Sequence, residues 1–140
     1  EGASLEKEFT LRIENIRNYM NQALVLDPER VNNIKERLQT AIDELKVNVD
    51  TNRFEQELIY YLEKLDITEE KVRLTNHLDY FLQTLNGSEA NGRKLGFITQ
   101  EMGREINTMG SKSNHAEMQK LVVMMKDELE KIKEQVLNVL

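Results

Sequence analysis

Apolar residues recur at steps of three and four along most of the chain, and this spacing fits a helix and no other regular structure. The clearest example lies near the C-terminus, where apolar residues alternate at steps of four and three: Met118, Val122, Met125, Leu129, Ile132, Val136 and Val139. A heptad pattern of this kind predicts a helix that packs along one seam. One Pro and six Gly in 140 residues are too few for an ordinary all-β domain. We therefore expect an all-α fold.

The same periodicity predicts four earlier helices. They cover about residues 4–26, 31–49, 53–85 and 89–109. Asp27-Pro28-Glu29 has the pattern of a helix start, so the first two helices are expected to form an antiparallel hairpin. Segment 53–85 would be about 50 Å long at 1.5 Å per residue. The prediction is an elongated bundle of about five helices with antiparallel hairpins and one very long helix, whose midpoint lies near segment 89–109.

Segment 86–113 differs from the rest of the chain in glycine content and in charge. It holds five of the six glycines, and its 4 basic and 3 acidic residues make it the only part that is not acidic in a chain of net charge −6. Each glycine inside a helix costs about 1 kcal/mol relative to Ala. Gly92, Gly96 and Gly103 therefore predict close approach of another backbone or of a ligand. We expect a turn over 110–113, and then a capping box formed by Asn114 and Glu117.

Two sets of polar residues share a spacing that places each set on one helix face. The first is Asp66, Glu70, Arg73 and His77, and the second is Glu101, Glu105, Thr108 and Lys112. Two carboxylates four residues apart can both reach one divalent ion. A neighbouring arginine can hold a phosphate, and a histidine can move a proton near neutral pH. The structural alternative for both sets is a solvated face with helical ion pairs worth about 0.2–0.5 kcal/mol each.

Several classes of function are excluded by the sequence. The chain has no cysteine, so it has no disulfide, no zinc–thiolate site and no cysteine nucleophile. No apolar run approaches the roughly 20 residues that a membrane span needs. Nucleotide-binding glycine loops and metal motifs such as H-E-x-x-H are absent. The chain begins with Glu1-Gly2-Ala3, and we expect it to be a single helical domain, residues 1–140, cut from a longer protein.

Three stretches of the chain resemble the C-terminal half of the bacterial YicC/YloC family. The most specific is 92–113, which reads GRKLGFITQEMGREINTMGSKS, and the others are FEQEL at 54–58 and DITEE at 66–70 with Arg73, Leu74 and His77. The resemblance covers the whole chain. Gly96 stands where the family motif usually has Asp, and Gly103 where it usually has Asn. If that Asp is a metal or substrate contact in the family, the site is weakened here.

The resemblance implies a bacterial, cytoplasmic, stress-induced protein that cleaves RNA as a metal-dependent endoribonuclease. It implies RNA and further copies of the same chain as partners, no membrane, and Mn²⁺ or Mg²⁺ as cofactor. The expected catalytic residues are Glu101, Glu105 and His77. The expected metal ligands are Glu101, Glu105, Asp66 and Glu70. The expected RNA contacts are Arg93, Arg104, Asn107, Ser111 and Lys112, with the turn at 110–113 also offering backbone N–H groups to a phosphate.

A second hypothesis makes this chain a helical oligomerisation or scaffold module without a catalytic site of its own. The five apolar residues from Leu58 to Leu62 cannot all be covered by one neighbouring helix. We therefore expect a homo-oligomer under either hypothesis, and we leave open whether this half is active alone.

Overall fold

The computed structural model describes residues 2–45, 48–87 and 92–139, and this part of the chain forms five α-helices without a strand. The helices are α1 (Gly2–Glu44), α2 (Thr51–Lys64), α3 (Thr68–Asn86), α4 (Gly92–Lys112) and α5 (Ala116–Val136). The predicted all-α class with antiparallel packing is confirmed, whereas the division of residues 4–85 into helices differs from the prediction. In the described segments, no helix combines the length and the apolar character that a membrane crossing requires.

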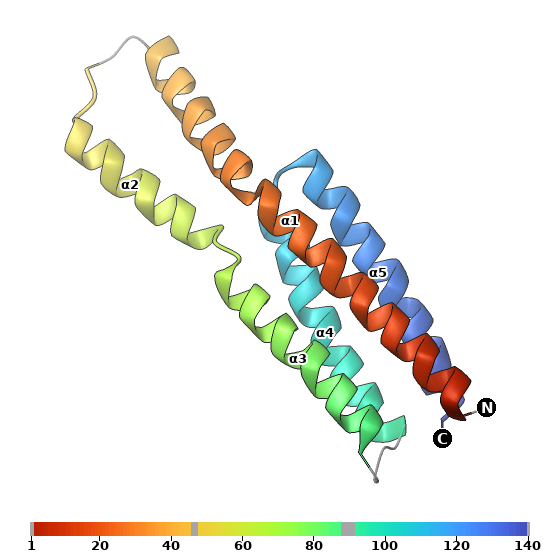
Figure 1. The fold of residues 1–140 in the computed structure, drawn as a ribbon. Helices are drawn as coiled ribbons and strands as arrows, with labels where there is room; N and C mark the ends of the chain where they lie inside the picture. The colour runs from red at the N-terminus through yellow and green to blue at the C-terminus, as the bar shows by residue number, and fades with distance from the viewer. Residues whose placement is uncertain (1, 46–47, 88–91, 140) are drawn as a thin grey trace.

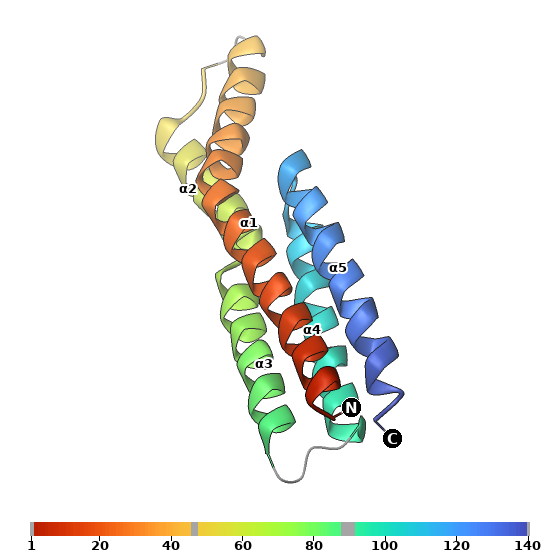
Figure 2. The ribbon, with the colours of Figure 1, turned by 45° about the vertical axis from the view of Figure 1, so that its right-hand side comes forward.

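Four of the helices surround one core. α1 packs on α5 and α3, and α4 packs on α3 and α5, so each helix has two neighbours that run in the opposite direction (Figures 1 and 2). Phe9 of α1 and Phe81 of α3 meet edge to face at the core, with ring centroids 5.3 Å apart. The heptad residues of α5 from Met118 to Val136 are buried in this core, which confirms the predicted packing seam.

The expected break at Asp27-Pro28 is wrong. α1 continues through Pro28 and is the very long helix of the fold, with 43 residues. Pro28 lies on an exposed part of the helix, whereas Ala23 and Ile34 on either side of it are buried. These two residues are eleven positions apart, about three helical turns, so one buried face continues past the proline. The predicted hairpin between segments 4–26 and 31–49 does not form.

The expected single helix over 53–85 is also wrong. α2 ends at Lys64 and α3 begins at Thr68. In a continuous helix, the carbonyls of Leu65 and Asp66 would accept hydrogen bonds from residues 69 and 70. Instead, Arg30 donates to the Leu65 carbonyl at 2.8 Å and Lys112 donates to the Asp66 carbonyl at 3.0 Å. Ile67 fills the break with a buried side chain.

Arg30 joins three parts of the bundle. Its side chain is 1% exposed and donates to the Asp27 carboxylate at 2.7 Å, to the Lys112 carbonyl at 2.7 Å and to the Leu65 carbonyl at 2.8 Å. These partners belong to α1, to the end of α4 and to the α2–α3 joint. This role cannot be predicted from the local pattern, because a lone arginine beside an acidic residue is usually a surface ion pair.

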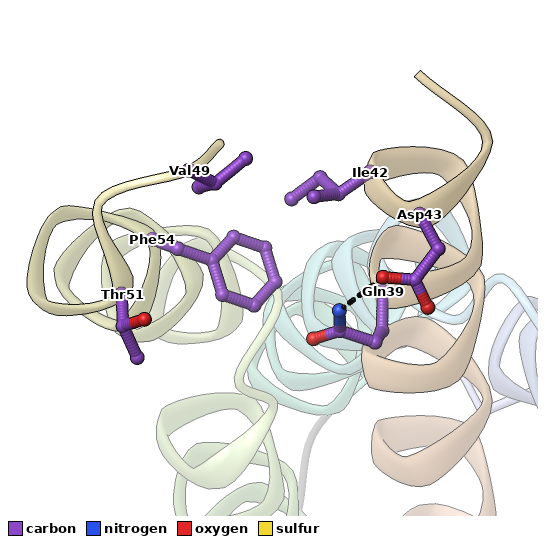
Figure 3. A pocket seen from close by; sticks show the side chains of 6 residues that line it. All are labelled: Gln39, Ile42, Asp43, Val49, Thr51 and Phe54. Carbon is purple, nitrogen blue, oxygen red and sulfur yellow. Dashed lines mark hydrogen bonds between the residues drawn. The ribbon is translucent and has the colours of Figure 1, made fainter. Parts of the chain in front are cut away.

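The far part of α1, residues 35–44, and α2 together form an arm that extends beyond the four-helix bundle (Figure 1). α2 buries none of its side chains. A groove of about 350 Å³ separates the two helices near their connection. Figure 3 shows Val49 and Phe54 on one side of this groove and Ile42 on the other.

Three glycines let α4 pack closely on α5. Gly96, Gly103 and Gly110 are seven residues apart and so lie along one side of α4. A Cβ atom would lie 3.8 Å from Val136 at Gly96, 3.4 Å from Leu129 at Gly103 and 3.1 Å from Val122 at Gly110. The predicted close approach is therefore that of a neighbouring helix. Gly92 is buried at the start of α4.

The predicted boundary between the last two helices needs correction. α4 continues to Lys112, so 110–112 is helical and does not form the expected turn. His115, and not Asn114, is the N-cap of α5, because its Nδ1 accepts a hydrogen bond from the Met118 N–H at 3.2 Å. The capping box of Asn114 and Glu117 is therefore wrong.

The spacing at the glycines predicts a difference between two substitutions in α4. Gly96→Ala should raise the free energy of unfolding by up to about 1 kcal/mol, because Ala favours a helix and the new methyl group meets Val136 at an ordinary distance. Gly110→Ala should give a less stable protein than Gly96→Ala, because Val122 must move to admit the methyl group. Urea denaturation measures both. Equal stability of the two variants would contradict the packing described here.

Candidate functional site

A cluster of five charged side chains lies where α3 and α4 meet at the surface of the bundle, and we call this line of contact the α3–α4 groove. The cluster is referred to as the α3–α4 ion cluster, and its members are Glu69, Glu70, Arg73, Glu105 and Lys112. Arg73 lies at its centre: its guanidinium donates to Glu105 at 2.9 Å, to Glu69 at 3.1 Å and to Glu70 at 3.2 Å. Both predicted polar faces, one from each helix, therefore meet in one place.

Lys112 completes the cluster from the end of α4. Its ammonium group lies 3.2 Å from both carboxylate oxygens of Glu70 and also binds the Asp66 carbonyl. Glu70 is buried at 2% exposure, so its charge depends on Lys112 and Arg73 for compensation. The expectation that the middle of segment 53–85 lies near segment 89–109 is thereby confirmed.

The cations of the cluster are held by carboxylates. Hydrogen bonds from Arg73 to Glu105 and Glu69 raise the pKa of its guanidinium above the ordinary value, so the group stays charged at physiological pH. With two cations and three carboxylates, the cluster is net negative by one charge. A phosphate that binds Arg73 competes with three carboxylates for its guanidinium, and one that binds Lys112 competes with Glu70.

The four predicted metal ligands do not converge. Glu70 and Glu105 belong to the ion cluster. Asp66 accepts a hydrogen bond from the Thr68 hydroxyl, and Glu101 pairs with Arg104 at 3.5 Å. No group of three or more acidic or histidine side chains suited to a metal ion occurs within residues 2–45, 48–87 and 92–139. These residues of a single chain do not fit a metal site by themselves, and the divalent ion stays a prediction.

The three predicted catalytic residues lie on the two helices that the ion cluster joins, with His77 on α3 and with Glu101 and Glu105 on α4. α3 and α4 run antiparallel, and Arg73 of one helix meets Glu105 of the other. One turn further along, this register places His77 of α3 level with Glu101 of α4. The next contact in the same direction brings Lys94 over the ring of Tyr80, 5.1 Å from its centroid. His77 and Glu101 are both partly exposed, so a substrate in the groove can reach them.

Four of the five predicted RNA contacts lie on the outer face of α4, away from the ion cluster. Arg93, Arg104, Asn107 and Ser111 are exposed and follow one side of the helix. Lys112 points instead into the groove, toward Glu70. The predicted presentation of free N–H groups by 110–113 is wrong, since these residues continue α4 through Lys112 and Ser113 N–H donates to the Gly110 carbonyl.

Sequence reasoning missed the structural roles of His115 and Arg30. The sequence predicts His115 as an exposed residue beside a helix start, but its side chain is 8% exposed and caps α5. Its other ring nitrogen lies 3.6 Å from the Glu29 carboxylate of α1. Its position just before a predicted helix was the available signal, although histidine is an uncommon N-cap.

The ion cluster predicts unequal effects for two adjacent glutamates. Glu70→Gln should lower the free energy of unfolding by about 1.5–3 kcal/mol, because Lys112 and Arg73 lose the buried charge that they share. Glu69→Gln is the matched control, and its side chain is 79% exposed, so its effect should stay within about 0.5 kcal/mol. Urea denaturation at neutral pH checks both variants. Similar losses for the two would contradict the assigned role of Glu70.

Comparison with known proteins agrees with the resemblance in the sequence. The model of the family described as "Endoribonuclease YicC-like, C-terminal" matches residues 24–140. A relative from Clostridioides difficile named "Probable endoribonuclease YicC" is 37% identical, and one of the same name from Haemophilus influenzae is 33% identical. Each alignment covers 99% of this chain and 48% of the relative, so the chain spans about half the length of these relatives. The chain therefore belongs to the YicC-like endoribonuclease family, as its C-terminal domain.

Proposed function

We propose that the full-length protein cleaves RNA in the bacterial cytoplasm and that this chain supplies the cleavage groove between α3 and α4. Family membership supports the reaction class, since relatives that match over nearly the whole chain are named as probable endoribonucleases. The location is supported by the ion pair of Arg73 with Glu105 at 2.9 Å, because the antiparallel register of α3 and α4 then puts His77 and Glu101 one helical turn further along.

The groove offers the groups that phosphodiester cleavage needs. His77 can take the proton from a ribose 2′-hydroxyl, whose oxygen then attacks the adjacent phosphorus while the bond to the 5′-oxygen breaks. This route leaves a 2′,3′-cyclic phosphate and a 5′-hydroxyl end. Glu101, level with His77, can stabilise the imidazolium that forms. Arg73 supplies positive charge for the transition state when the phosphate competes with Glu105 for its guanidinium.

The RNA on either side of the cleaved bond is held on the exposed face of α4 in this proposal. Arg93, Arg104, Asn107 and Ser111 contact phosphate and ribose there, and Lys112 contributes at the end of the helix by exchanging Glu70 for a phosphate. The requirement for Mn²⁺ or Mg²⁺ remains part of the proposal. Because the described residues of one chain gather no ligand set, further ligands would have to come from RNA, another copy or the other half of the protein.

Glu101 gives the clearest test of the groove. In the full-length protein, Glu101→Gln should lower the cleavage rate by up to about 10⁴-fold, as when the carboxylate that supports a catalytic histidine is replaced by its amide, while helicity and oligomer mass stay unchanged. Glu130→Gln in α5 is the matched control, with a side chain that is 65% exposed. Gel analysis of a labelled RNA measures the rate. Wild-type cleavage by the double variant Glu101→Gln/Glu105→Gln would remove this groove from consideration.

The chemical ends of the RNA fragments in this assay distinguish two cleavage mechanisms. A 2′,3′-cyclic phosphate on the upstream fragment indicates attack by the ribose hydroxyl and a role for His77 as base. A 3′-hydroxyl end instead indicates attack by water, and would assign His77 a different role.

A second function for this chain is oligomerisation through the arm. α2 buries no side chain, and its residues Ile59, Tyr60 and Tyr61 are 57%, 57% and 42% exposed. Exposed apolar groups gathered on one helix are typical of a protein interface. We propose that they meet a second copy of the chain, so that assembly and catalysis use different ends of the molecule.

If the arm forms the interface between copies, a positive charge placed on it should weaken the homo-oligomer. Ile59→Lys should reduce the oligomer mass in light scattering at micromolar concentration, because the interface would have to bury an unpaired ammonium group. Val25→Lys is the control, since Val25 is 77% exposed but lies on α1 within the bundle region. A wild-type protein that is monomeric in the same measurement, or an unchanged mass for Ile59→Lys, would refute the role of the arm.

A further inference from the structure

Six exposed residues form a continuous strip along the outer face of α4. We call it the α4 strip, and its members are Arg93, Phe97, Gln100, Arg104, Asn107 and Ser111. They follow one another at steps of four and three. At about 100° per residue they fall within a sector of about 80° around the helix axis. The strip lies between the glycine side of α4, which contacts α5, and the side that faces α3.

The charge of the strip is opposite to that of the whole chain. It holds two arginines and no acidic residue, whereas the chain has a net charge of −6. Arg104 is 78% exposed and has one carboxylate at its flank, that of Glu101 at 3.5 Å. A row of arginines, amides and a hydroxyl without carboxylates suits a polyanion, because each group can donate a hydrogen bond to phosphate or ribose oxygens.

Phe97 lies within this polar strip with its side chain open to solvent. It is 60% exposed, so the fold does not use it for the core. The core side of α4 is already occupied by other residues, namely Leu95, Ile98, Met102, Ile106 and Met109. Along the helix axis Phe97 lies about 6 Å from Arg93 and about 10.5 Å from Arg104, at 1.5 Å per residue. An aromatic ring flanked by arginines is the combination that single-stranded nucleic acids bind.

The exposed aromatic residues of the arm provide a contrast. Tyr60 and Tyr61 lie on α2, whose three glutamates outnumber Arg53 and Lys64 by one charge, and Lys64 already lies over the Tyr60 ring, 4.5 Å from its centroid. The α4 strip is net basic, so it attracts a phosphate chain more strongly than α2 does. The difference selects Phe97 as the aromatic residue suited to RNA.

We propose that the α4 strip binds single-stranded RNA, with the ring of Phe97 stacked on an unpaired base. Arg93 and Arg104 contact the phosphates on either side, and the Gln100 amide, one turn from Phe97, bonds to the edge of the base. A base inside a duplex is already stacked on its neighbours and cannot accept the ring. The substrate class is therefore single-stranded RNA or an unpaired loop. This inference rests on the proposed function and makes it more specific.

The test measures RNA binding by the full-length protein. The probes are a fluorescently labelled oligouridylate and the same RNA paired with its complement, and the readout is fluorescence anisotropy. Phe97→Leu keeps the apolar volume but removes the aromatic face, so it should weaken binding of the single strand by roughly 5- to 150-fold, which corresponds to about 1–3 kcal/mol per stacked base. Binding of the duplex should change less than twofold. Phe97→Trp should retain single-strand binding. Met124→Leu, at an exposed position of α5, is the control substitution.

The possible outcomes separate this inference from the proposed function. A wild-type protein that cleaves RNA, with Phe97→Leu equal to wild type on the single strand, overturns the stacking role and leaves the cleavage groove standing. Equal losses on single strand and duplex also overturn it, because they indicate a general contact. A change in oligomer mass for Phe97→Leu with unchanged RNA affinity shows that the strip meets protein. A wild-type protein that neither binds nor cleaves RNA refutes both proposals. Photocrosslinking of 4-thiouridine RNA to the peptide with Phe97 would support the inference directly.

Discussion

The buried guanidinium of Arg30 is the interaction on which the arrangement of the helices depends. A buried charge is tolerated only when its hydrogen bonds are satisfied, and Arg30 achieves this with the Asp27 carboxylate and the carbonyls of Leu65 and Lys112. Both carbonyls lie at helix ends, where no helical partner is available for them. Arg30 therefore fixes where α2 stops and where α4 stops. It also brings these two ends together against the middle of α1.

The groove follows from this joint. Lys112, at the end of α4, reaches Glu70 in the first turn of α3 because the two helix ends meet beside Arg30. From there the antiparallel helices pair Arg73 with Glu105 and bring His77 level with Glu101. The glycines of α4 complete the arrangement by admitting α5 on the opposite side. The α4 strip remains exposed between these two contacts, and α2 leaves the bundle at the same joint to form the arm.

Periodicity and composition predicted the fold class and the heptad seam of α5, because these are properties of a single helix and its buried face. The glycines of α4 predicted a close approach, and the structure shows that the neighbour is α5. The continuity of α1 could also have been predicted from the sequence, since Ala23 and Ile34 lie on the same helix face on either side of Pro28. The break between α2 and α3 could not be predicted in this way. It depends on Arg30 and Lys112, which lie 35 and 46 positions away in the sequence and donate hydrogen bonds to the carbonyls of Leu65 and Asp66. For the site, spacing showed which residues share a helix face. Which carboxylate pairs with which cation is set by the register of two helices, and a local pattern does not contain it.

Hydrogen–deuterium exchange on Arg30→Lys tests the central claim most directly. Lysine keeps the charge but cannot reach three partners on three elements. The account predicts a loss of stability of about 3–5 kcal/mol, with faster exchange concentrated at residues 65–71 and 110–113. At the end of the bundle near Phe9 and Phe81, protection from exchange should fall only as much as the lower global stability requires. Uniformly faster exchange, or unchanged protection at the α2–α3 joint, would contradict the view that Arg30 holds these helix ends together.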